Sequence, residues 1–131
     1  MLSRAELKRI STARLQDADI LLKARRYDGA MYLCGYAIEL GLKLRICKTL
    51  HWPEFPETSA DFKDLQSFKT HDFNALLRLS GIEATIKTLY LVEWSIVRQW
   101  KPELRYSKTK TISPQTATDR LTAAKLLLKA L

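Results

Sequence analysis

The sequence predicts an all-α fold, an up-and-down antiparallel bundle of about five helices. Apolar residues recur at helical spacing along most of the chain, and no stretch shows the strict alternation and β-branched enrichment of a strand. Hydrophobic residues make up 47% of the chain and charged residues 27%, the balance of a folded globular protein. A chain of 131 residues can bury one core but is too short for two ordinary domains, so we expect a single domain over residues 1–131.

The first two expected helices form the first half of the bundle. Helix one covers residues 3–25, where Ser3 can cap the start and Glu6 completes a capping box. Helix two covers residues 28–50, with Asp28 as its expected N-cap and a Trp-Pro pair after its end. Helix two is apolar nearly all round, so it should be the spine of the bundle.

An ordered loop and a short helix are expected next. Residues 51–70 contain two prolines among mixed polar and aromatic residues, which predicts a loop with one short helical turn. Thr70 or Asp72 can cap a third helix that Gly81 ends. No internal repeat and no Gly-rich phosphate loop is present in the sequence.

Two further helices complete the expected bundle. The fourth runs from Glu83 to about Gln99, before a Lys-Pro pair that breaks it. Residues 107–114 form a polar connector, and the fifth helix starts near Ser113 or Pro114, since proline suits a first helical turn.

Cysteine usage and hydropathy exclude several classes of protein. Cys34 and Cys47 have neither CxxC spacing nor a nearby His cluster, so we expect reduced, buried thiols, no zinc site and no cofactor. The charged N-terminus lacks the apolar run of a signal peptide. Charged residues interrupt the apolar segment over residues 30–47, which disfavours a membrane-spanning helix. A cytoplasmic protein without membrane association is expected.

The charge balance favours an anionic partner. Lys and Arg number 22 against 14 Asp and Glu, a formal net charge of +8. Nucleic acid or an acidic protein would suit this balance. The basic residues are spread along the chain, however, and a solvated surface would explain many of them.

A polar stripe runs down the otherwise apolar helix two. On a helical wheel its members fall within a sector of roughly 80°; they are Asp28, Tyr32, Tyr36, Glu39 and Lys43. One interpretation is a pocket for a phosphate or a base, with the tyrosines available for stacking. The alternative is an internal salt bridge that fixes how the helices register.

Glu39 needs a cationic partner, because an unpaired buried carboxylate is costly. The candidates are Lys43, one turn along the helix, and Arg105 from the far segment. We therefore expect Glu39, Lys43 and Arg105 to form one connected polar site.

Three stretches together resemble the HEPN family, over nearly the whole chain. They are RYDGAMYLCGYAIELGLK over residues 26–43, KTHD over residues 69–72 before a Leu-rich turn, and Trp100 with Arg105 and Tyr106. The resemblance implies a bundle of about five helices, commonly dimeric. It also implies a place in prokaryotic toxin–antitoxin pairs, in defence systems or beside nucleotidyltransferase partners.

Many members of that family are metal-independent ribonucleases with a late Arg and His separated by about four to six residues. The late segment here, residues 98–107, contains arginines but no histidine, so no catalytic residue is expected in that place. Arg45 and His51 match the spacing, but they lie at the end of helix two. Six helical positions would leave their side chains roughly 120° apart, so we do not expect them to act as a pair.

Three hypotheses of function remain. The first is a HEPN-like module without catalysis that recognises a nucleotide, RNA or a nucleotidyltransferase-type partner. The second is a metal-independent ribonuclease of a toxin–antitoxin or defence system, using dispersed residues such as Arg98, Arg105 and His71. The third is a structural oligomerisation domain. The candidate binding residues are Asp28, Tyr32, Tyr36, Glu39, Lys43, His71, Arg98, Arg105 and Tyr106.

The remaining marked residues have structural interpretations as well. His71 either donates a proton or bonds a loop carbonyl. Trp52, Trp94 and Trp100 are better explained as core or dimer contacts than as base-stacking groups. The glycines within helix two, at positions 35 and 41, indicate close approach by another helix or by a second chain, so a homodimer is expected.

Overall fold

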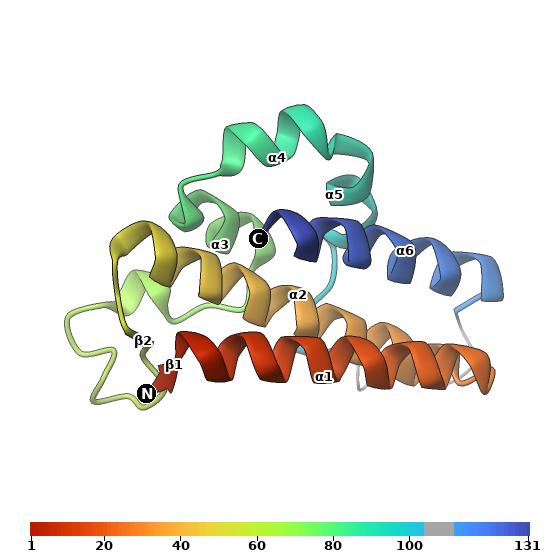
Figure 1. Cartoon of the computed structure of the whole chain (residues 1–131), viewed down its shortest axis with the longest axis horizontal. Helices are drawn as coiled ribbons and strands as arrows, with labels where there is room; N and C mark the ends of the chain where they lie inside the picture. The colour runs from red at the N-terminus through yellow and green to blue at the C-terminus, as the bar shows by residue number, and fades with distance from the viewer. Residues whose placement is uncertain (104–111) are drawn as a thin grey trace.

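The computed structural model describes residues 1–103 and 112–131, and within them the all-α prediction is confirmed (Figure 1). Two long helices form an antiparallel hairpin, and the last helix packs along it. The elements are β1 (Leu2–Ser3), α1 (Arg4–Lys23), α2 (Tyr27–Leu50), β2 (Glu54–Phe55), the 3-10 turn η1 (Gln66–Phe68), α3 (Phe73–Ser80), α4 (Glu83–Leu89), α5 (Leu91–Val97) and α6 (Pro114–Ala130).

The start of α1 is the predicted capping box. The Ser3 N–H donates to Glu6 Oε2 at 2.8 Å, and the Glu6 N–H donates to Ser3 Oγ at 3.2 Å. Further along, the Asp19 carboxylate contacts Lys23 Nζ on the same helix and Lys125 Nζ on α6, each at 3.1–3.2 Å. This second pair ties α1 to the end of the chain.

Helix α2 is the spine of the fold, as predicted, because α1, α3, α6 and β2 all pack against it. The predicted N-cap was wrong. The helix starts at Tyr27, and Arg26 occupies the cap position without a side-chain hydrogen bond. The Ala30 N–H already donates to the Arg26 carbonyl at 3.0 Å, so Asp28 lies inside the first turn, where a carboxylate still favours the helix dipole.

The two glycines inside α2 are explained by contacts within the chain. A Cβ atom on Gly35 would lie 2.0 Å from the Trp100 indole, and one on Gly41 would lie 2.5 Å from Leu128 of α6. A side chain at either position would displace its neighbour. The glycines therefore need no second chain to account for them.

The prediction that no strand would form was wrong in one small place. β1 and β2 form an antiparallel pair in which Leu2 faces Phe55. A two-residue strand is too short to show any periodicity in sequence. Phe55 is 1% exposed, so the pair fastens the start of the chain over the end of α2.

The loop and the third helix follow the prediction. The 3-10 turn η1 is the expected short helical turn, and α3 begins after Asp72, whose carboxylate accepts from the Ala75 N–H at 2.9 Å. Gly81 ends the helix with φ of 77°, a left-handed conformation that glycine adopts without strain.

The predicted fourth helix is two helices in the structure. It breaks at Tyr90, whose φ of −130° and ψ of 33° are not helical. The break lets α4 run across the top of the bundle in Figure 1 while α5 turns back to pack against α6. It also leaves Leu89, Leu91 and Val92 more than half exposed.

The last helix begins as predicted. Ser113 caps α6 by accepting from the Thr116 N–H at 3.1 Å, and Pro114 occupies the first turn. Of the expected connector over residues 107–114, the part before residue 112 lies outside the described residues. Among the helices that are described, none carries an apolar run long enough to cross a bilayer.

Candidate functional site

The polar stripe of α2 exists, and its members touch one another as helical spacing requires. The Tyr32 and Tyr36 hydroxyl oxygens are 3.3 Å apart, and their rings pack edge to face with centroids 5.0 Å apart. One turn further on, Lys43 Nζ donates to Glu39 Oε2 at 3.2 Å. Each contact joins positions i and i+4 of one helix face.

Glu39 is the centre of this stripe, and it has a partner from outside α2. Its side chain is 3% exposed, and its Oε1 lies 2.6 Å from Nδ1 of His71. His71 belongs to the loop just before α3, so this contact joins two segments that are 32 positions apart in sequence. Both carboxylate oxygens of Glu39 therefore have a basic partner.

Arg105, the other expected partner of Glu39, and Tyr106 lie outside the described residues. Within the described part of the chain, His71 and Lys43 already occupy both carboxylate oxygens. Of the predicted site of Glu39, Lys43 and Arg105, the Glu39–Lys43 contact is present, and His71 is a further partner of Glu39.

Glu39 holds His71 in one orientation at the surface. The His71 side chain is 59% exposed although its Nδ1 is bound to a buried carboxylate. When Nδ1 carries the proton, it donates to Glu39 and leaves Nε2 as an acceptor; in the charged ring, Nε2 is a donor. Such a ring can bind an anion or transfer a proton without first having to be ordered.

Lys43 is held more tightly than His71. Its side chain is 16% exposed, and its ammonium lies 5.4 Å from the centre of the Phe55 ring. The carboxylate on one side and the aromatic ring on the other fix the charge in place. Lys43 thus offsets the charge of the Glu39 carboxylate and is not a mobile cation.

The tyrosines of the stripe belong to an aromatic cluster with Trp100. The Tyr36 and Trp100 ring centroids are 5.1 Å apart, those of Tyr32 and Trp100 are 6.2 Å apart, and Phe73 stacks on Trp100 at 5.3 Å. Trp100 is 7% exposed. The packing makes this cluster primarily a structural joint between α2, α3 and the segment after α5.

The other two tryptophans are also packed. Trp94 is 3% exposed and lies against Phe73, with centroids 6.3 Å apart. Trp52 contacts Phe68 at 4.9 Å in the loop after α2. These contacts agree with the prediction that the tryptophans serve packing.

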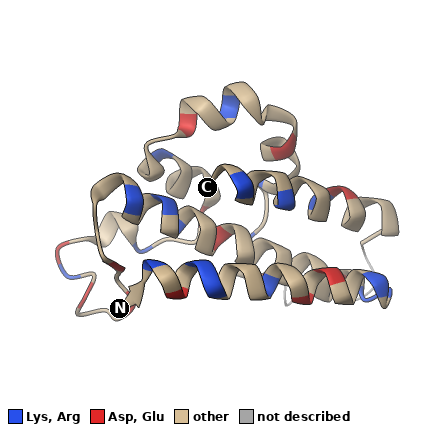
Figure 2. Ribbon diagram, in the orientation of Figure 1, with Lys and Arg blue, Asp and Glu red and all other residues tan. Residues whose placement is uncertain are grey.

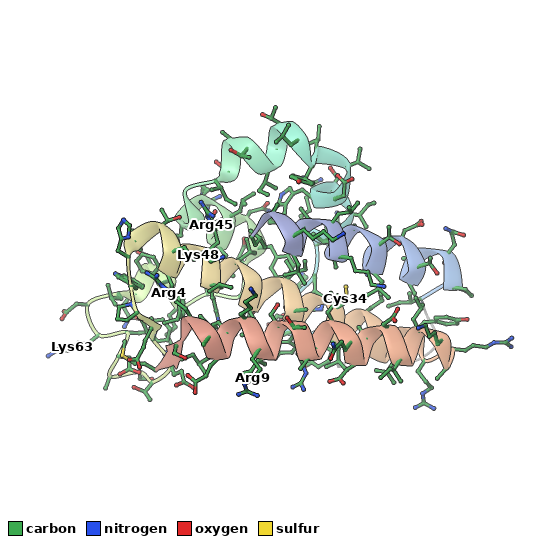
Figure 3. The ribbon with its side chains drawn as sticks, in the orientation of Figure 1. Arg4, Arg9, Cys34, Arg45, Lys48 and Lys63 are labelled. Carbon is green, nitrogen blue, oxygen red and sulfur yellow. The ribbon has the colours of Figure 1, made fainter. Side chains whose placement is uncertain are left out.

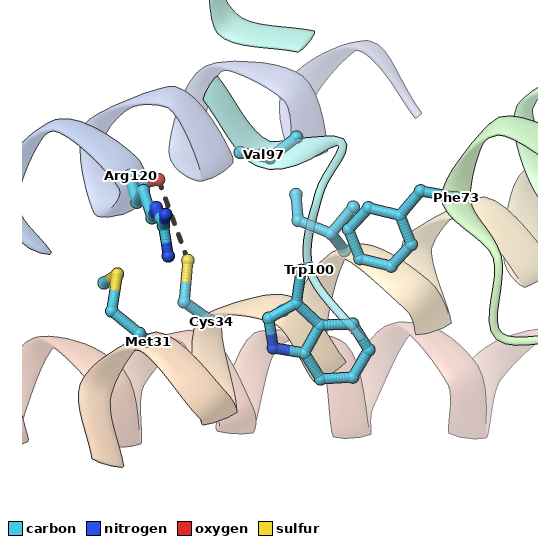
Figure 4. A pocket seen from close by; sticks show the side chains of 8 residues that line it. Met31, Cys34, Phe73, Val97, Trp100 and Arg120 are labelled. Carbon is cyan, nitrogen blue, oxygen red and sulfur yellow. Dashed lines mark hydrogen bonds between the residues drawn. The ribbon is translucent and has the colours of Figure 1, made fainter. Parts of the chain in front are cut away.

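A cavity next to this cluster is too small for a nucleotide. It measures about 10 Å³, space for about one water molecule. Figure 4 shows Cys34, Trp100 and Phe73 around it, with Cys34 Sγ 3.7 Å from the Arg120 carbonyl oxygen. Burial raises the pKa of the Cys34 thiol to about 12, so the thiol stays protonated. Its full lining is Met31, Cys34, Gly35, Ile38, Phe73, Val97, Trp100 and Arg120.

A larger hollow lies at the hinge between α1 and α2. Its volume is about 680 Å³, within the range that small-molecule sites occupy. Asp28 lines it, together with Arg25 and Arg26. The structure therefore places Asp28 in a different environment from Glu39.

Among the described residues, neither Arg98 nor the spaced pair Arg45 and His51 contacts Glu39 or His71 through a hydrogen bond or an ion pair. Arg98 is exposed at the end of α5, and no hydrogen bond or ion pair joins it to His71 in the described part of the chain. His51 ends α2 with a left-handed φ of 57°, while Arg45 lies within the helix. Nothing in this geometry makes Arg45 and His51 a pair.

Sequence reasoning named Glu39, Lys43 and His71 but did not join the histidine to the carboxylate. The one available signal was the need of a buried Glu39 for a cation. Only the fold brings the loop before α3 against the middle of α2. Among the described residues, no group of three or more His, Cys, Asp or Glu side chains is placed to hold a metal.

No family model matches this chain, and no curated protein or solved structure does either. The resemblance to the HEPN family therefore stays a prediction.

Proposed function

We propose that this chain is a HEPN-like helical module that binds RNA or a nucleotide through phosphate groups, with His71 as a contact residue. The observation that carries the proposal is the 2.6 Å contact between the buried Glu39 carboxylate and the exposed His71 ring. A buried carboxylate is costly to maintain, and here it orients a solvent-facing imidazole.

The charge of the chain supports an anionic ligand. The formal net charge is +8, and Lys and Arg positions recur along α1, α2 and α6 in Figure 2. Such a balance attracts phosphate backbones over a range set by the salt concentration. Lys43 Nζ lies 3.2 Å from Glu39 Oε2 and so offsets the carboxylate charge behind the His71 ring.

The test is a binding titration with a short single-stranded RNA and with a nucleotide. His71→Ala should weaken binding measurably, because the oriented ring is lost. His51→Ala is the matched control, since it removes the other histidine of the chain, at the exposed end of α2. Equal affinity of the two variants and the wild type would contradict a role for His71.

Metal-independent RNA cleavage is a second candidate, favoured by the same pair. A carboxylate bound to Nδ1 fixes an imidazole so that Nε2 can accept or donate a proton. Lys43 binds the other oxygen of the same carboxylate and helps to hold it in place. Cleavage of a structured RNA in the presence of a chelator, lost in His71→Ala and kept in His51→Ala, would favour this candidate. Binding without cleavage would favour the first.

A nucleotidyltransferase-type protein partner is the other expectation of the resemblance. Its test is co-purification with the product of a neighbouring nucleotidyltransferase gene, if the genome has one. A stable complex with such a partner and no RNA affinity would replace the nucleic-acid proposal.

A further inference from the structure

Four basic side chains come together where α1 begins and α2 ends. Arg4 and Lys8 are one turn apart on α1, and Arg45 and Lys48 are about one turn apart on α2, so each pair shares a helix face. Arg4 joins the two pairs, because its Nη2 donates to the Cys47 carbonyl at 2.9 Å. Figure 3 shows Arg4, Arg45 and Lys48 at the same end of the molecule. We call these four residues the basic cluster.

Asp and Glu side chains do not neutralise the basic cluster. Among the described residues, none of its four side chains makes an ion pair with an Asp or Glu side chain. Burial lowers the pKa of Lys48, and the charges of Arg45, Lys8 and Arg4 lower it further. The charges are therefore close enough to repel one another.

Helix capping explains only half of the basic cluster. Arg4 bonds carbonyl oxygens at the end of α2, and Lys48 Nζ donates to the Leu131 main-chain oxygen at 3.0 Å. Cations are favourable at helix C-termini, so these two residues have a structural role. Lys8 has no such contact in the described residues, and the buried Nε of Arg45 has no acceptor there.

We propose that Arg4, Lys8, Arg45 and Lys48 form a binding surface for successive phosphates of an RNA backbone. This inference rests on the proposed function and names a surface through which that function would act. Lys8 and Lys48 are exposed and supply direct contacts, while Arg4 holds α1 against α2. The cations are spread over about one turn of each of two helices, which suits a run of phosphates better than one small anion.

This surface is distinct from the His71 site. Lys43 and Arg45 are two residues apart on α2, which places their side chains roughly 200° apart around the helix. His71 lies on the Lys43 side, because both contact Glu39. An RNA touching both surfaces would have to pass around the end of α2.

The test measures RNA affinity at several salt concentrations for Lys8→Glu, Lys48→Glu and Arg9→Glu. Arg9 is the matched control because it is next to Lys8, is exposed, and in Figure 3 points to the side of α1 away from α2. We expect about tenfold weaker binding for Lys8→Glu and Lys48→Glu, and a salt dependence lowered by roughly one phosphate contact. Arg9→Glu should change affinity far less.

Equal losses in all three variants would overturn the proposal, because they would show only the effect of net charge. Lys8→Gln, with thermal melts of each variant, separates a lost contact from a lost fold. Loss of binding confined to variants that melt early would also overturn it.

Two further probes identify the source of the phosphates. If Lys8→Glu and Lys48→Glu weaken binding to phosphatidylserine vesicles but not to RNA, the RNA surface is wrong. If inorganic phosphate saturates the cluster without competing with RNA, it is also wrong.

The proposal and the proposed function fail in different ways. RNA binding that needs His71 but not Lys8 or Lys48 would leave the proposed function standing and remove the basic cluster from it. RNA binding that needs Lys8 and Lys48 but not His71 would support the basic cluster and remove His71 as a contact residue from the proposed function. A wild-type chain with no RNA affinity would overturn both.

Discussion

Glu39 shows how a single buried charge joins two segments, α2 and the loop before α3. Its carboxylate is 3% exposed and binds Lys43 and His71 with separate oxygens. The cost of burying this charge is offset only while both partners remain, so the loop before α3 is tied to α2. The helical period identified the Lys43 contact, because i and i+4 are neighbours. It carried no information about His71.

Removing Lys43 alone should destabilise the fold more than removing Lys43 and Glu39 together. We expect Lys43→Met to lower the free energy of unfolding by about 3 kcal/mol, since it leaves a buried carboxylate with only one basic neighbour. The double variant Glu39→Leu with Lys43→Met should be more stable than Lys43→Met alone. Urea unfolding of the wild type, both single variants and the double variant measures this; a double variant less stable than Lys43→Met would contradict the coupling.

Gly35 is required by its contact with Trp100. Its missing side chain makes room for an indole that Tyr36 and Phe73 hold from other sides. Gly35→Ala should therefore destabilise by about 3 kcal/mol through overpacking. Gly29→Ala is the control, because its Cβ would meet only a flexible Leu21 methyl at 3.3 Å; it should change stability by less than about 1 kcal/mol. Similar melting temperatures for the two variants would refute the close approach.

The cysteine thiols should be unreactive in the folded chain. Burial raises the pKa of Cys34 to about 12 and also raises that of Cys47, so at pH 9 the folded Cys34 thiol stays protonated while an unfolded thiol is about half ionised. Alkylation at pH 9 should be slow in buffer and fast in denaturant. Because the folded state holds these protons longer, stability should fall as the pH rises above 9. Rapid alkylation of the native protein would show that the thiols are accessible.

At the scale of elements, the end of α2 depends on a residue from the start of α1. The Arg4 guanidinium donates to the Cys47 carbonyl at 2.9 Å and to the Trp52 carbonyl at 2.7 Å. The Cys47 carbonyl also accepts the Trp52 N–H at 2.9 Å, whereas the Trp52 carbonyl lies past the end of the helix. The sequence showed where α1 and α2 end. It did not show the hydrogen bond from Arg4 to the Trp52 carbonyl, which joins residues 48 positions apart.

Arg4→Ala should destabilise the fold by about 2 kcal/mol, because two carbonyls lose a charged donor. Arg9→Ala removes the same charge from the exposed side of α1 and should change stability by less than about 0.5 kcal/mol. Thermal melts of both variants at the same pH and salt give the comparison. An Arg4 variant as stable as the Arg9 variant would mean that water replaces the guanidinium without cost.

The break between α4 and α5 had no signal in sequence. Residues 83–99 have a continuous helical pattern, and Tyr90 is neither glycine nor proline. The bend follows from packing, since α5 must return to α6 while Ile86 and Trp94 both stay buried. Tertiary contacts override local preference here.

For the whole molecule, self-association remains a prediction. The two glycines of α2 suggested a second chain in the sequence analysis. They no longer support a homodimer, because Trp100 and Leu128 of the same chain occupy the spaces above Gly35 and Gly41. Light scattering at micromolar concentration should give twice the mass of one chain if the chain dimerises. The mass of one chain would refute the homodimer.

Most of the fold was determined by the sequence itself. Helical periodicity and local capping residues are short-range signals, and they identified α1, α2, α3 and α6 with most of their ends, because a cap acts on residues within one turn. Only the tertiary structure decided what depends on contacts between distant segments. Three features were decided by packing rather than by local preference. They are the pairing of Glu39 with His71, the meeting of Arg4 and Lys8 with Arg45 and Lys48, and the bend at Tyr90. Side-chain spacing along one helix specifies its faces, but which segment covers each face is chosen by the burial of the whole core.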